Sequence, residues 1–71
     1  METIGGILMF KYILYYDGGF LRDSADLGYT YETEEETKED VEMEIESRIS
    51  DWELDGVEYE KELFEIIIEG V

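Results

Sequence analysis

The sequence predicts a single small α+β domain of order β-β-α-β, with one acidic helix packed on a three-stranded sheet. Runs rich in aromatic and β-branched residues, typical of strands, lie on both sides of a long segment with helical periodicity. Asp-Gly pairs, which favour turns, separate these segments. The length of 71 residues leaves room for one domain only. We expect this domain to occupy residues 10–71, and residues 1–9 to be a flexible appendage.

The first half of the domain is predicted to hold two strands. Phe10–Tyr16 is rich in aromatic and β-branched residues and stops at the turn signal Asp17-Gly18-Gly19. Residues 17–27 are expected to form a loop or an irregular hairpin. Gly28–Glu32, with two tyrosines on one face, is predicted as a short second strand.

The clearest element is a helix from Glu34 to Ser50. Thr33 has the side chain of an N-cap, and Glu36, three residues later, completes a capping box. Apolar residues recur at helical spacing and form one stripe, made of Val41, Ile45, Ile49 and Trp52. This stripe is predicted to pack on the sheet.

After a turn at Asp55-Gly56, Leu63–Ile68 is predicted as the final strand. Its apolar run is nearly continuous, which is typical of a strand buried on both faces. One helix covers only one face of a sheet, so some Tyr and Ile side chains on the other face are expected to stay open. An open face of this kind predicts a homodimer or a partner there.

The net charge limits the classes of partner. The chain has 21 Asp and Glu against 5 Lys and Arg, a net charge of −16. A net charge of about 2–8 is enough to keep a small domain soluble, so solubility alone does not account for this value. Without a basic patch the chain is not expected to bind nucleic acid or an anionic membrane directly. The lack of cysteine fits a reducing cytoplasm.

No catalytic constellation is found in the sequence. There is no histidine to activate a serine or threonine, and histidine is also the commonest transition-metal ligand. Pairs of carboxylates are abundant, but a chain of 71 residues can hardly build the deep cleft that a glycosidase needs. We therefore expect a non-enzymatic protein without a cofactor.

The acidic residues of the predicted helix fall into two rows. The first ridge is Glu35, Glu39, Glu42 and Glu46, the second ridge is Glu36, Asp40, Glu44 and Asp51, and Met43 lies between them. Most neighbouring carboxylates in a row are three or four residues apart, about 4.5–6 Å along the helix, which is close to the spacing of phosphates along a nucleic-acid strand. We interpret these nine residues as a partner-binding surface that imitates phosphates. The alternative is a solvated helix face, but such faces usually mix Glu with Lys.

Residues 51–62 offer a different interpretation, because they resemble the loop of an EF-hand. Asp51, Asp55, Gly56 and Glu62 match loop positions 1, 5, 6 and 12. Glu53 at position 3 departs from the pattern, and a β-branched run follows Glu62 where a second helix would stand. A calcium-binding module is therefore the alternative, and no metal site is assigned.

In size, charge and a Glu-rich helix on a small sheet, with EEETKEDVEMEIE leading into DWELDGVEYEKE, the chain resembles phage-encoded DNA-mimic inhibitors, above all anti-CRISPR proteins. The resemblance covers residues 30–69 by character and rests on no family motif. It implies an inhibitor that occupies the basic surface of a nucleic-acid-binding protein, such as a CRISPR effector complex, in a bacterial cytoplasm. An adaptor for some other basic protein is a further alternative.

Overall fold

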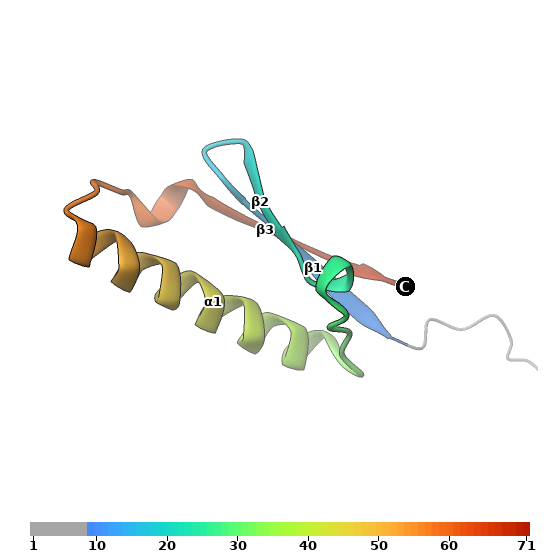
Figure 1. The fold of residues 1–71 in the computed structure, drawn as a ribbon. Helices are drawn as coiled ribbons and strands as arrows, with labels where there is room; N and C mark the ends of the chain where they lie inside the picture. The colour runs from blue at the N-terminus through green and yellow to red at the C-terminus, as the bar shows by residue number, and fades with distance from the viewer. Residues whose placement is uncertain (1–8) are drawn as a thin grey trace, which may run out of the picture.

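In the computed structural model, which describes residues 9–71, one helix lies along one face of a three-stranded antiparallel sheet (Figure 1). The elements are β1 (Phe10–Tyr16), β2 (Gly19–Asp23), the short 3-10 helix η1 (Ser24–Leu27), α1 (Glu34–Asp55), the 3-10 helix η2 (Lys61–Leu63) and β3 (Phe64–Gly70). The strand order β2-β1-β3 places β1 at the centre. The predicted α+β class and the order β-β-α-β are confirmed.

The second strand was predicted in the wrong place. It is Gly19–Asp23, which pairs antiparallel with β1 directly after a two-residue turn. In that turn Asp17 and Gly18 have φ angles of 50° and 79°, the left-handed conformations that tight hairpins require. The pairing is irregular between Leu14 and Tyr15. Of the predicted strand at 28–32, only Tyr31 pairs, through one bridge to Phe10.

The helix forms as its N-terminal sequence predicts and continues further than expected. The Thr33 hydroxyl accepts a hydrogen bond from the Glu36 amide at 3.0 Å. The Glu36 carboxylate accepts from the Glu32 amide at 3.3 Å, one residue before the cap. The helix passes the predicted end at Ser50 and stops at Asp55, where Gly56 with φ 75° provides a left-handed C-cap.

The core is the contact between α1 and the central strand. Its buried members are Tyr12, Leu14, Val41 and Ile45, with Ile49 and Phe64 packed against them. Trp52 continues the helix stripe in an aromatic cluster, 5.0 Å from Tyr16 and 5.5 Å from Phe64 between ring centroids. The predicted apolar stripe therefore does face the sheet.

The final strand is not buried on both faces, contrary to the prediction. Ile66 is 37% exposed and Ile67 is 41% exposed. β3 is an edge strand, and α1 is centred on β1, so it covers β3 only in part. An apolar run alone does not reveal whether a strand lies in the centre or at the edge of its sheet.

Within residues 9–71, α1 leaves the opposite face of the sheet open, as expected (Figure 1). Side chains alternate along a strand, so Ile13 and Tyr15 point away from the helix that buries Tyr12 and Leu14. Ile67 pairs with Ile13 and lies on this open face. Phe20, 59% exposed, packs edge-on against Tyr15 at 6.1 Å.

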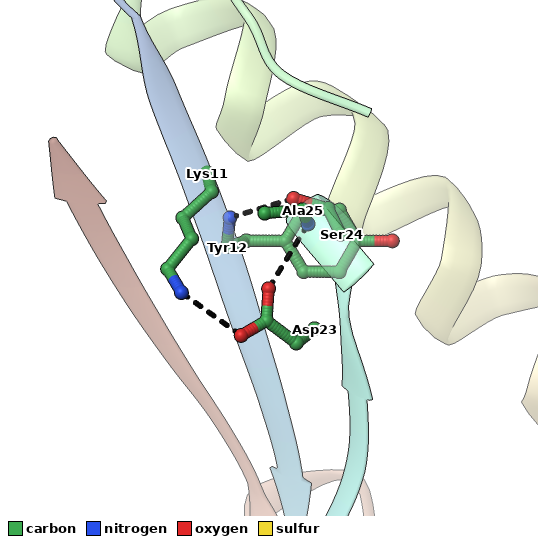
Figure 2. A network of polar contacts seen from close by, with 5 residues as sticks. All are labelled: Lys11, Tyr12, Asp23, Ser24 and Ala25. Carbon is green, nitrogen blue, oxygen red and sulfur yellow. Dashed lines mark hydrogen bonds and ion pairs between the residues drawn. The ribbon is translucent and has the colours of Figure 1, made fainter. Parts of the chain in front are cut away.

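A network of polar contacts links β1 to the end of β2 and the start of η1 (Figure 2). Lys11 Nζ lies 2.9 Å from Asp23 Oδ2, and Asp23 Oδ1 accepts a hydrogen bond from the Ala25 amide at 2.9 Å. The bond from Lys11 holds the pKa of the Asp23 carboxyl below its ordinary value. The buried Ser24 hydroxyl accepts from the Tyr12 amide at 3.1 Å. These bonds fix the turn that leads from the hairpin toward the helix.

The predicted appendage falls almost entirely outside the described residues. Residues 1–8 are not described, so the expectation for them stays a prediction. Met9 is described and half-buried, and its carbonyl accepts a hydrogen bond from the Val71 amide at 3.0 Å. The backbone of Met9 therefore contacts the C-terminal end of the domain, and the boundary between residues 9 and 10 stays a prediction.

The core contact gives a first prediction. Leu14→Ala should lower the free energy of unfolding by about 2–5 kcal/mol, because it opens a cavity at a fully buried site. Leu54→Ala removes the same atoms from a side chain that is 83% exposed and should change stability by less than about 0.5 kcal/mol. Urea denaturation followed by circular dichroism measures both. Equal losses in the two variants would contradict this position of the core.

Candidate functional site

The first ridge is a continuous row of exposed carboxylates. Glu35, Glu39, Glu42 and Glu46 are all exposed. Among residues 9–71, none of the four carboxylates lies within ion-pair distance of a Lys or Arg. Lys38, the only cation in the N-terminal half of α1, is also exposed. This ridge is the part of the predicted surface that is open to a basic partner.

In the second ridge, the two central carboxylates are already paired with other residues of the protein. Glu44 lies 3.0 Å from Arg22 Nη1 and 2.7 Å from Arg48 Nε, with only 19% of its side chain exposed. Asp40 is half-buried and accepts a hydrogen bond from the Tyr31 hydroxyl. Only Glu36 and Asp51, at the two ends, are exposed. The two ridges are therefore not equivalent, although the sequence pattern made them look alike.

Strand β2 is the reason for this difference. Arg22 pairs with Leu14, whose side chain is in the core, so Arg22 points toward the helix and reaches Glu44. Burial and the bond to Asp40 raise the pKa of the Tyr31 hydroxyl above its ordinary value, so this hydrogen bond persists into alkaline solution. Sequence reasoning missed both contacts because the partners lie outside the helical pattern, Arg22 at 22 positions from Glu44 and Tyr31 at 9 positions from Asp40.

Met43 lies on the exposed side of the helix, as predicted. Its side chain is 66% exposed and borders a shallow hollow of about 350 Å³ together with Tyr29 and Arg22. A flexible thioether at this place offers apolar contact between two rows of carboxylates. Of the nine predicted site residues, six acidic ones and Met43 are exposed, and Asp40 and Glu44 are tied to the fold.

The segment that resembles an EF-hand does not form a loop from its first position. Asp51, Glu53 and Asp55 lie in the last turns of α1, and Gly56 caps that helix. Glu62 lies in η2, just before β3. Within the described part of the chain no group of three potential ligands is placed to hold a metal ion. Helical backbone at positions 1–5 does not bring those oxygens around one ion.

One further feature was missed by sequence reasoning, a groove between α1 and β3. It has a volume of about 400 Å³ and is lined by Glu42, Ile45, Glu46, Lys61, Phe64 and Ile66. It exists because β3 lies at the sheet edge and is only partly covered by the helix. The isoleucines of β3 were the available signal, but they suggested a central strand.

Comparisons with known proteins add no assignment. No protein-family model matches this sequence, and no significant match was found among curated proteins or solved structures. In the described residues, no helix combines the length and apolar character needed to cross a membrane.

The inequality of the ridges is testable by stability. Glu44→Gln should lower the free energy of unfolding by about 1–2 kcal/mol, because it leaves Arg22 and Arg48 without a carboxylate. Glu42→Gln is the matched control on the first ridge and should leave stability unchanged or slightly raised, since it removes one unpaired like charge. Urea midpoints measure both. Equal destabilisation by the two substitutions would show that Glu42 is also paired.

The exposed carboxylates give a further prediction. Melting temperature should rise as sodium chloride is added, because screening relieves repulsion in a chain of net charge −16. Micromolar calcium chloride added at constant sodium chloride serves as the second arm. A melting temperature that falls between low and moderate salt would mean that the charges are mostly paired. Stabilisation by micromolar calcium alone would favour the calcium module.

Proposed function

We propose that this protein is a non-enzymatic inhibitor that imitates nucleic acid and occupies a basic DNA- or RNA-binding surface of another protein. As the target we favour a CRISPR effector complex in a bacterial cytoplasm. With that target, the chain would be a phage-encoded anti-CRISPR protein. The observation that supports this proposal is the first ridge, four exposed carboxylates on one side of a long helix without a cation paired to them among residues 9–71.

The geometry of the first ridge suits a row of phosphate-binding side chains. From Glu35 to Glu46 the helix rises about 16 Å, at about 1.5 Å per residue. Neighbouring residues of the ridge lie about 4.5–6 Å apart along the helix axis. Arg and Lys side chains that normally hold successive phosphates can therefore meet successive carboxylates. Each such pair is a charge-assisted hydrogen bond, which is stronger than one between neutral groups.

The second ridge contributes less than the sequence pattern suggested. Asp40 and Glu44 already have partners in Tyr31, Arg22 and Arg48, so pairing them with a target would cost those bonds. Glu36 and Asp51 remain as exposed charges at the ends. The proposed mimic thus presents one complete phosphate row, with Met43 beside it as the apolar contact.

Two other partner assignments remain as proposals beside this one. An adaptor for a basic protein unrelated to nucleic acid would use the same first ridge, and only competition with nucleic acid separates it from a mimic. A homodimer would use the open sheet face around Ile13, Tyr15 and Phe20, on the side away from α1. Because the two faces are opposite, dimerisation would leave the first ridge accessible. Sedimentation equilibrium measures that association.

The proposal predicts that capture of the target depends on the first ridge. The triple variant Glu39→Lys, Glu42→Lys and Glu46→Lys should lose its partner from a host lysate, because basic residues would then face lysines. The matched control reverses Glu58, Glu60 and Glu62, which are also exposed but lie beyond the helix. Pull-down with mass spectrometry identifies proteins that the native chain and the control retain and that the triple variant loses. If the triple variant retains the same partners, the first ridge does not bind them and is only a solvated surface.

The native chain should displace labelled DNA or RNA from the captured target, and the triple variant should not. A compact acidic protein condenses fewer counterions than DNA, so its affinity should fall less steeply with salt. Inhibition should therefore strengthen relative to DNA between about 50 and 200 mM salt. If the target binds the protein and nucleic acid simultaneously at every salt concentration, the mimic hypothesis is wrong and the adaptor hypothesis is favoured.

A further inference from the structure

The groove between α1 and β3 combines an apolar floor with an acidic wall. Ile45, Phe64 and Ile66 provide the apolar side chains, and Ile66 is still 37% exposed. Glu42 and Glu46, the last two members of the first ridge, line the helix side. Lys61 is the only cation of the lining. The groove therefore suits a side chain with an aliphatic stem and a positive head, such as arginine or lysine.

The backbone of β3 offers a second set of partners next to this groove. β3 pairs with β1 along one edge, and it stands last in the sheet order. Among the described residues, no backbone hydrogen bond reaches the other edge of residues 65–69. An unpaired edge of this kind accepts an added strand, whose backbone bonds give affinity while alternate side chains give specificity.

Charge selects the occupant of this edge. Glu65 and Glu69 flank the exposed Ile67 on the open face of β3, so acidic side chains border the edge on both faces of the sheet. A second copy of the chain fits poorly. Two β3 strands paired antiparallel about Ile67 would set Glu65 opposite Glu69 of the second copy, twice, and like charges directly opposite each other are destabilising. A cationic strand would instead meet carboxylates on either face.

We propose that an extended arginine- and lysine-rich segment of a partner protein adds to the free edge of β3 as a fourth strand. Its alternate side chains lie in the groove, where their stems contact Ile45 and Ile66 and their heads pair with Glu42 and Glu46. This goes beyond the occupation of a nucleic-acid-binding cleft, because it requires backbone pairing and does not require a partner that binds nucleic acid.

The test uses a fluorescent nine-residue peptide of alternating arginine and valine, titrated at about 150 mM salt to weaken long-range attraction. Glu42→Gln with Glu46→Gln should lower its affinity by about tenfold or more, because both groove carboxylates are lost. Glu35→Gln with Glu39→Gln is the matched control, with the same change of net charge on the same ridge outside the groove. It should lower affinity by less than about threefold. Equal losses in the two double variants would overturn the proposal.

Backbone pairing needs its own control. The same peptide with every backbone amide N-methylated keeps its charges and loses its donors, so it should bind much more weakly. Hydrogen exchange of the β3 amides should slow when the unmodified peptide binds. If the methylated peptide binds equally well, or if exchange in residues 64–70 is unchanged, the peptide binds through charge alone and does not add as a strand.

The outcome separates this inference from the proposed function. If the peptide fails to bind while the charge-reversed variant still loses its target, only the fourth-strand proposal is wrong. If the peptide binds as expected while nucleic acid is never displaced from the target, the mimic is wrong and the strand site stands.

Discussion

The contact of α1 with the central strand sets the position of every surface described above. Val41 is fully buried and Ile45 nearly so, against Tyr12 and Leu14. Because these two helix residues are one turn apart, their burial fixes the rotation of the helix, and the acidic residues must then lie on its two flanks and its outer side. The same small core has to offset the mutual repulsion of a net charge of −16. Trp52 extends the contact to the far end of the helix, packing on Tyr16 and Phe64.

The two flanks of the helix differ because the two edge strands differ. On the β2 side Arg22 points at the helix, and together with Arg48 it neutralises Glu44 within the fold. On the β3 side the corresponding strand offers Ile66, and Glu42 and Glu46 border a groove with only Lys61 as a cation. Repulsion that the fold relieves on one flank therefore remains on the other. A basic partner would gain both its own ion pairs and the relief of that repulsion.

Local signals in the sequence predicted the local parts of this structure. The Thr33 cap, the apolar stripe from Val41 to Trp52 and strand β1 are each encoded within one short segment, and the structure has them. The errors concern pairing across distance. For residues 17–27 the sequence left a loop or an irregular hairpin open, and the structure has the hairpin, whose second strand β2 replaces the strand expected at 28–32. The edge position of β3 depends on strands elsewhere in the chain. The bond from Arg22 to Glu44 crosses 22 positions, so no periodic pattern could have separated Glu44 from the free carboxylates.

The acidity of this chain has a consequence at its sheet edge as well as on its helix. Three consecutive isoleucines on an edge strand resemble a segment prone to pair with copies of itself. Glu65 and Glu69 flank that run, and charged residues on an edge strand oppose self-association. The same carboxylates attract a strand of opposite charge, so one charge pattern disfavours the wrong occupant and favours a cationic one. In the fourth-strand proposal, charge therefore selects the occupant, while backbone pairing and the apolar groove supply the affinity.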